Sequence, residues 1–174
     1  MAKQSFLKGA FILLLANIIV KSMGFIYQIL IVRMISPEGI GIFNMIFPLY
    51  ITALVLTTAG IPLAVSKYVA EETALNKRES AERIFGSAVT LLFIFSTIIT
   101  FFFILIAPTL IKTLYTDSRI LPAFLFLLPA LLFVSLSSTI KGFFQGLQDM
   151  RPTAVTQLIE QIIRISSGFL LIYL

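Results

Sequence analysis

The chain has 174 residues, of which 59% are hydrophobic and 12% are charged, and its mean hydropathy is +1.04. A soluble domain carries about 25% charged residues, so this composition cannot cover a water-exposed surface. The absence of cysteine and histidine excludes disulfides, thiol chemistry and any metal site or catalytic triad that needs an imidazole. The net charge of +5 does not indicate nucleic acid, because the basic residues lie at the ends of apolar runs, where they meet lipid headgroups.

Five apolar runs follow one another, each long enough to cross a bilayer, which takes roughly 20 residues. We expect membrane-spanning segments at about residues 9–33, 40–68, 84–111, 120–143 and 153–174. They must be helices, because a helix satisfies its own backbone polar groups in lipid and the runs lack the alternation of barrel strands. The predicted fold class is therefore an all-α polytopic membrane protein. Because the last run ends without an anchoring charge, we expect a fragment whose C-terminal remainder is missing.

The first run carries a polar face. Asn17, Lys21, Gly24 and Gln28, which we call the Lys21 face, recur at spacings of four, three and four and so share one side of a helix. Lys21 lies about halfway along the run, where a charge costs on the order of 2.5–3.5 kcal/mol to insert. Snorkelling is a poor alternative because both interfaces are distant. We therefore expect this face to line the bundle interior or a watery cavity.

The middle runs carry packing signals rather than charges. Gly60 and Pro62 favour a kink in the second run, and the two threonines before them are of a type that commonly bonds its own helix backbone. Gly142 and Gly146 fit the small-xxx-small pattern that allows membrane helices to approach closely.

The fifth run carries a second polar face. Thr153, Gln157, Glu160, Arg164 and Gly168, the Arg164 face, fall on one side of a helix. Glu160 and Arg164 stand at i and i+4, so the plain alternative is that they neutralise each other and let the span insert. Polar faces on two separate spans favour a hydrophilic cavity over that alternative. With two basic groups against one acid, the cavity would suit an anionic or phosphate-bearing ligand.

The predicted cavity takes side chains from the first and fifth runs, namely Asn17, Lys21, Gln28, Gln157, Glu160 and Arg164. The sequence contains no phosphate-binding loop and no carboxylates at catalytic spacing. We therefore expect neither an enzyme nor a bound metal or cofactor.

Basic residues are unevenly divided between the two ends of the spans. One side collects eight of them, Lys3, Lys8, Lys67, Lys77, Arg78, Arg83, Lys141 and Arg151, and the other collects three, Arg33, Lys112 and Arg119. Because cytoplasmic loops carry the excess of Lys and Arg, we expect a cytoplasmic N-terminus.

Eight segments, spread over nearly the whole chain, carry a family resemblance. They are Phe6–Gly9, Lys21–Phe25, Gly39–Phe43, Gly60–Lys67, Ala70–Glu71, Lys141–Gly146, Met150–Ala154 and Glu160–Arg164. In order and spacing they resemble the polysaccharide-export branch of the multidrug/oligosaccharidyl-lipid/polysaccharide exporter superfamily. Within that branch they are similar to the stage V sporulation protein B group, a relative of the lipid II flippases.

The resemblance implies a transporter of two pseudo-symmetric lobes around a central cavity, like the multidrug extrusion proteins, with residues 1–174 in the N-terminal lobe. It implies translocation of an undecaprenyl-diphosphate-linked saccharide from the inner to the outer leaflet of a bacterial plasma membrane, for cell-wall or spore-cortex assembly. In the lipid II flippases a basic residue three before the first-span Gly-Phe contributes to the cavity, and Lys21 holds that position. An Arg-Asp pair follows in those flippases, whereas this chain has Tyr27 and Gln28, which argues against lipid II itself.

Transport needs an energy source, and the lack of a nucleotide-binding motif favours an ion gradient or the membrane potential, with Glu160 as the candidate coupling group. One alternative is a drug/cation antiporter of the same superfamily, which would favour acidic and aromatic cavity residues. Another is a non-transporting scaffold for cell-wall synthesis proteins, which would tolerate neutral replacement of Lys21 and Arg164. The expected partners are the lipid-linked saccharide and membrane lipids, not nucleic acid.

Overall fold

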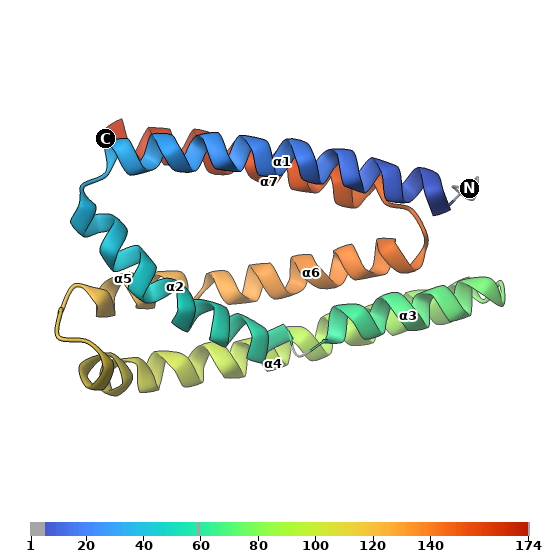
Figure 1. The fold of residues 1–174 in the computed structure, drawn as a ribbon. Helices are drawn as coiled ribbons and strands as arrows, with labels where there is room; N and C mark the ends of the chain where they lie inside the picture. Colours follow the sequence, from blue (N-terminus) through green and yellow to red (C-terminus); the bar gives the residue numbers. More distant parts are fainter. Residues whose placement is uncertain (1–5, 59, 174) are drawn as a thin grey trace. The chain divides into compact units, whose positions relative to one another are not determined.

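The computed structural model describes residues 6–58 and 60–173, and the regular secondary structure in these two ranges is entirely α-helical (Figure 1). The helices are α1 (Phe6–Met34), α2 (Pro37–Thr58), α3 (Ile61–Ala74), α4 (Arg78–Leu114), α5 (Ile120–Leu127), α6 (Ala130–Gly146) and α7 (Arg151–Tyr173). Five segments are long and apolar enough to cross a membrane: Gly9–Met34, Pro37–Ala74, Arg78–Leu114, Ile120–Gly146 and Arg151–Ile172. The predicted fold class, an all-α polytopic membrane protein with five candidate spans, is confirmed.

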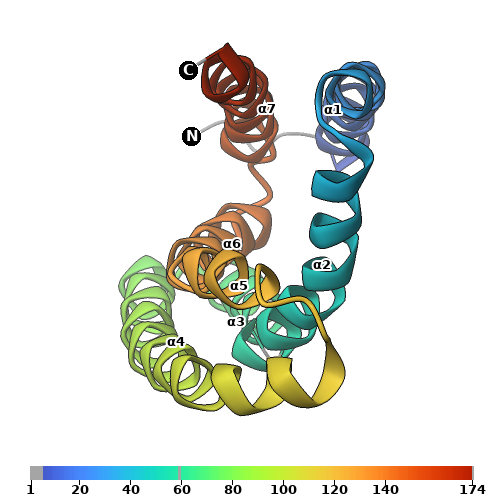
Figure 2. The same cartoon turned by 90° about the vertical axis from the view of Figure 1, so that its left-hand side faces the viewer.

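The helices form two compact units. One contains α1 and α7, and the other contains residues 41–146, with α3 to α6 and most of α2. The first unit is a single helix pair, whereas the second is a bundle in which α3 packs against α4 and α6, and α4 packs against α5 and α6 (Figure 2).

The bundle has an apolar core near the junction of α4 and α5. The aromatic rings of Phe103 and Phe124 meet edge to face, with centroids 6.5 Å apart. The core consists of Ile46, Ala53, Phe103, Ala107, Ile111, Ile120, Phe124, Leu128 and Leu131. A hydrogen bond from the Tyr115 hydroxyl to the Met45 carbonyl oxygen, 2.9 Å long, ties the end of α4 to α2.

Gly142 and Gly146 bring α6 against the backbone of α3. A Cβ atom on Gly142 would lie 2.5 Å from the Pro62 carbonyl oxygen, and one on Gly146 would lie 2.7 Å from the Ser66 carbonyl oxygen. Neither approach is possible for a residue with a side chain unless the helices separate. The predicted small-xxx-small contact is therefore confirmed, and α3 is the helix that it admits.

The second predicted span consists of two consecutive helices, as its Gly60-Pro62 signal indicated. Gly60 has a φ of 77°, which glycine adopts without strain, and Pro62 stands in the first turn of α3. The threonines that end α2 donate to their own helix, Thr57 to the Ala53 carbonyl oxygen at 2.7 Å and Thr58 to that of Leu54 at 3.0 Å.

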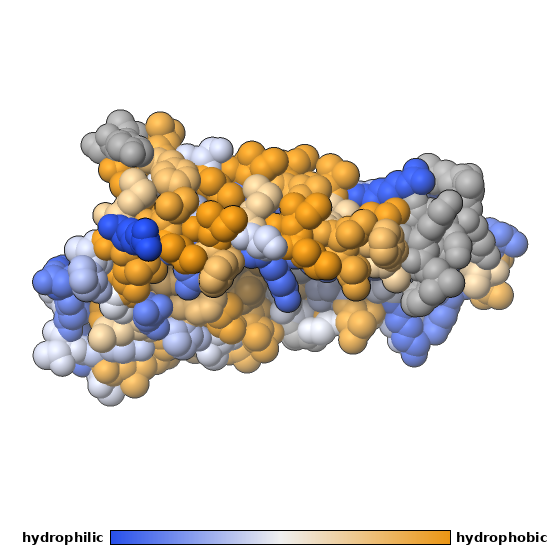
Figure 3. All heavy atoms as spheres, turned by 45° about the horizontal axis from the view of Figure 1, so that its top comes forward, coloured by the Kyte–Doolittle hydropathy of each residue, from blue (hydrophilic) through white to orange (hydrophobic). Residues whose placement is uncertain are grey.

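Large apolar side chains are exposed along the helices, as expected of surfaces that face lipid rather than water. On α1 they include Phe11, Leu14, Ile18, Phe25 and Ile26. Figure 3 shows hydrophobic residues over much of one face of the molecule, with a few hydrophilic groups among them. A soluble protein rarely exposes so much contiguous apolar surface.

Candidate functional site

All six predicted cavity residues belong to the helix pair of α1 and α7, which lie side by side (Figure 1). Gly24 lies beside Gln161 and Arg164, and Tyr27, one turn further along α1, lies beside Gly168 and Phe169. Residue numbers therefore rise in the same direction on both helices, so the pair is parallel. This is the arrangement expected of the first and fifth spans of a polytopic protein, which leave the same side of the membrane.

Lys21 lies in the middle of α1, about 20 Å from either helix end at a rise of about 1.5 Å per residue. Its side chain is exposed, as are those of Asn17 and Gln28 on the same face. An ammonium group at this depth needs a polar neighbour or water, because neither membrane interface is close.

Arg164 on α7 approaches the Lys21 face at Gly24. A Cβ atom on Gly24 would lie 3.7 Å from Arg164 Nη2, so the guanidinium group rests on the surface of α1 where the glycine leaves room. Gly24 follows Lys21 by three residues, so the guanidinium group meets α1 within about one turn of Lys21. The sequence predicted both basic residues, but it did not predict that Arg164 meets α1 at Gly24.

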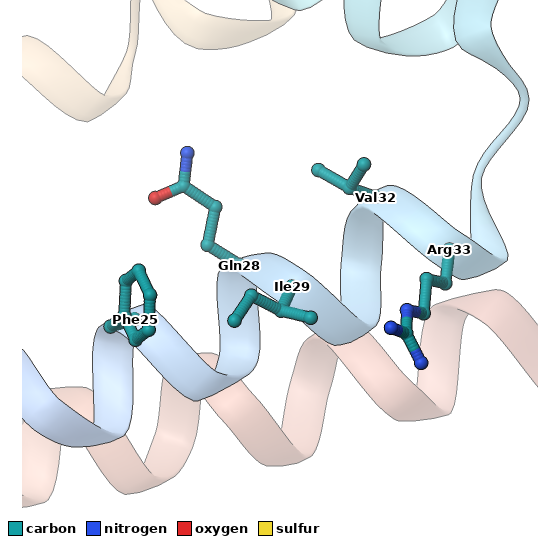
Figure 4. A pocket seen from close by; sticks show the side chains of 5 residues that line it. All are labelled: Phe25, Gln28, Ile29, Val32 and Arg33. Atoms are coloured by element: carbon teal, nitrogen blue, oxygen red, sulfur yellow. The ribbon is translucent and has the colours of Figure 1, made fainter.

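Gln28 lies one turn beyond Gly24 and lines an open hollow on α1. The other lining residues are Phe25, Ile29, Val32 and Arg33. In Figure 4 the Gln28 amide projects from α1 away from the α7 ribbon. The structure therefore keeps Gln28 on the Lys21 face, but it does not bring it into the contact between α1 and α7.

The remaining predicted residues on α7 have different surroundings. Glu160 is exposed, and Gln157 is partly buried with its Oε1 atom shielded and without a hydrogen-bond partner among the described residues. The parallel register places Asn17 at about the level of Gln157, about two turns before the place where Arg164 meets Gly24. The six side chains thus follow the length of the helix pair rather than converging on one point.

Gln161, which is not among the predicted cavity residues, is 2% exposed and lies against Gly24. Its Oε1 atom accepts a hydrogen bond from Arg164 Nη2. The signal that could have found it is the spacing of four that relates Thr153, Gln157 and Gln161, which places three polar side chains on one side of α7. That signal is weaker than a charge because an amide is far less costly to insert in a membrane.

Tyr27 fills the next turn of the contact. Its ring meets that of Phe169 edge to face at 6.0 Å, and its hydroxyl occupies the space that a Cβ atom on Gly168 would need. Tyr27 therefore packs α1 on α7 with an aromatic ring.

Lys21 and Arg164 carry the two types of basic group that bind anions in proteins. A guanidinium group offers a planar set of donors that matches phosphate oxygens, and an ammonium group adds a mobile point charge. Within residues 6–58 and 60–173, no three His, Cys, Asp or Glu side chains are grouped so that they could hold a metal ion.

Comparison with known proteins gives the family. The family described as "Polysaccharide biosynthesis protein" matches residues 6–174. Stage V sporulation protein B of Bacillus subtilis (strain 168) is 39% identical over 166 residues, which are 95% of this chain and 32% of that protein. Lipid II flippase MurJ of the same organism is 30% identical over 167 residues, 91% of this chain and 31% of that protein. Sporulation protein YkvU, also from that organism, is 25% identical over 166 residues, 95% of this chain and 36% of that protein.

The chain spans about a third of the length of the curated relatives that it matches. No solved structure matches it. Since the family match covers almost the whole sequence and agrees with the apolar helices, this multi-pass membrane protein belongs to the polysaccharide biosynthesis protein family.

Proposed function

We propose that the protein is a flippase that moves a saccharide linked to undecaprenyl diphosphate from the inner to the outer leaflet of a bacterial plasma membrane. The observation that carries the proposal is the approach of Arg164 to Gly24 on α1, which brings a second cation within about one turn of Lys21 near the middle of a pair of membrane helices. The family match, and the likeness to a protein described as a lipid II flippase, support the same reaction class.

Moving a diphosphate across a membrane explains why two cations are needed within the helices. A diphosphate cannot enter hydrocarbon unaided, because each polar group without a partner there costs several kcal/mol. Lys21 and Arg164 replace water around the diphosphate, while the apolar tail stays in the bilayer. The amides of Asn17, Gln28 and Gln157 provide hydrogen bonds to the sugar.

The proposal includes a cytoplasmic N-terminus, a second lobe that closes the cavity, and alternating access between the two leaflets. An ion gradient or the membrane potential drives the cycle, and Glu160, the one carboxylate of α1 and α7, couples to it. The saccharide serves assembly of the cell wall or the spore cortex, as the names of two sporulation relatives suggest.

The test is translocation of a fluorescent undecaprenyl-diphosphate saccharide in proteoliposomes that contain the full-length protein. Lys21→Ala and Arg164→Ala should each lower the initial rate roughly 10- to 100-fold, since each removes charge-assisted hydrogen bonds worth about 1.5–3 kcal/mol. Lys112→Ala, which removes an exposed basic side chain from the last turn of α4, is the matched control and should keep the rate.

If Lys21→Ala and Arg164→Ala both translocate the saccharide at the full rate and at normal protein levels, the proposed binding cavity is refuted. A scaffold would show no translocation even in the unchanged protein, while it still recruited cell-wall synthesis proteins. A drug/cation antiporter would export cationic dyes and leave the lipid-linked saccharide in the inner leaflet.

A further inference from the structure

Gln161 is the most deeply buried side chain of the contact between α1 and α7 that also carries hydrogen-bonding atoms. It is 2% exposed, and its Nε2 atom would lie 3.6 Å from a Cβ atom on Gly24. The glycine therefore makes room for the amide as well as for Arg164. An uncharged polar group enclosed between two membrane helices is expensive, so its presence needs a physical reason.

The two ends of the Gln161 amide have different surroundings. Oε1 accepts a hydrogen bond from Arg164 Nη2, whereas Nε2 is buried without a hydrogen-bond partner among the residues that the structure describes. A buried donor without an acceptor lowers stability. A leucine of similar size would avoid that cost and would pack as well against α1. Helix packing alone therefore does not account for a glutamine at this position.

The bond to Arg164 supplies the reason. Arginine has a long side chain that tends to extend toward a membrane interface, where its head group is hydrated. An acceptor one turn back along the same helix opposes that movement.

We propose that Gln161 is a positioning residue that holds the Arg164 guanidinium over Gly24, at the level of the Lys21 face. The inference rests on the proposed function, because it assigns to Gln161 the task of presenting Arg164 to the diphosphate. One N–H group of the guanidinium is used by the amide, and the others stay available to phosphate oxygens. Holding the guanidinium group in place before the ligand arrives lowers the entropic cost of binding.

The experiment measures two quantities on the detergent-solubilised full-length protein: affinity for farnesyl diphosphate, a short isoprenyl diphosphate, and the melting temperature without ligand. The variants are Gln161→Leu, Arg164→Gln and the double variant. Gln145→Leu, the same change at an exposed position near the end of α6, is the matched control. Lys21→Gln tests the ligand site independently.

Gln161→Leu should weaken diphosphate binding about tenfold and leave the melting temperature unchanged or higher, because it removes the unpartnered donor. In the double variant the loss should be no larger than with Arg164→Gln alone, since Gln161 acts through Arg164. Gln145→Leu should change neither quantity.

Two results would overturn the positioning role alone. The first is a lower melting temperature for Gln161→Leu with unchanged affinity, which is the signature of a packing residue. The second is multiplication of the two losses in the double variant, which would mean that Gln161 acts independently of Arg164. If Arg164→Gln and Lys21→Gln both keep full affinity, the proposed diphosphate site itself is wrong, and this pattern differs from the other two.

Discussion

Both compact units use glycine to bring helices together, but the glycines admit different neighbours. In the bundle of residues 41–146, Gly142 and Gly146 admit the backbone of α3, with carbonyl oxygens 2.5 and 2.7 Å from the Cβ positions. In the pair of α1 and α7, Gly24 admits the polar ends of Gln161 and Arg164, at 3.6 and 3.7 Å.

The difference separates a structural use of glycine from a functional one. Backbone against backbone is a rigid contact that gains van der Waals packing and tolerates no added atom. Glycine beneath the end of a long side chain leaves a space that a flexible group can enter or leave. We therefore expect substitutions in the bundle to change stability, and substitutions at Gly24 to change ligand binding.

The largest effect should come from Gly142→Ala and Gly146→Ala. Each new methyl group meets a backbone oxygen that cannot move aside, so α6 and α3 must separate at a cost of about 1–3 kcal/mol in the free energy of unfolding. Thermal melts followed by circular dichroism measure the loss. Gly86→Ala on α4 is the control, because its Cβ position has no neighbour within 4 Å, and its stability should stay equal or rise. Equal stability of all three variants would remove the distinction between the two units.

The next effect concerns Gly24, where the size of the substituent decides the outcome. Gly24→Ala should be tolerated, because its methyl group would make ordinary contacts with Gln161 and Arg164. Gly24→Leu should push the guanidinium away from the Lys21 face and weaken farnesyl diphosphate binding about tenfold. Isothermal titration of both variants checks the contrast. The idea fails if alanine and leucine weaken binding equally.

Gly168→Ala should have an intermediate effect on stability. The added methyl group requires the Tyr27 ring to turn, which breaks its edge-to-face contact with Phe169, worth about 0.5–1.5 kcal/mol, while alanine improves helix propensity. We expect a net loss below about 1 kcal/mol in the same thermal melts. Gly41→Ala, whose Cβ position is open, serves as the control. A loss as large as that of Gly142→Ala would mean that the ring is as rigid as a backbone.

The smallest effect on stability should come from a substitution in the polar loop between α4 and α5. A side-chain hydrogen bond from Arg119 lowers the pKa of Asp117, and the Arg119 backbone N–H, 2.9 Å from Asp117 Oδ1, acts in the same direction. The stabilisation is therefore present above the usual carboxyl pKa and is lost as the pH falls through the lowered pKa of the folded state. Asp117→Asn should lower the melting temperature slightly at pH 7, and the difference should shrink as the pH falls below the usual carboxyl pKa. A difference that persists in acid would point to a neutral hydrogen bond instead.

The sequence alone determined the class of the protein and its polar anomalies. The lengths of the apolar runs predicted helices that cross a bilayer, because a helix satisfies its own backbone polar groups there and the runs lack the alternation of barrel strands, and five candidate spans were found. Lys21 and Arg164 were visible because charge within an apolar run is costly. The Gly142 and Gly146 spacing predicted a close helix contact, which the bundle contains.

Only the tertiary structure decided which helix meets which. Periodicity defines the faces of a helix but does not identify the partner of each face. The polar faces of the first and fifth runs indicated a shared cavity, but the direct contact and register of α1 against α7, and the contact of α6 with α3, were not predicted. Gln161 escaped notice because its importance depends on a guanidinium and a glycine that come from 3 and 137 residues away. The chemical character of single residues could be predicted from the sequence. Their positions relative to one another could not, because these depend on packing between distant segments.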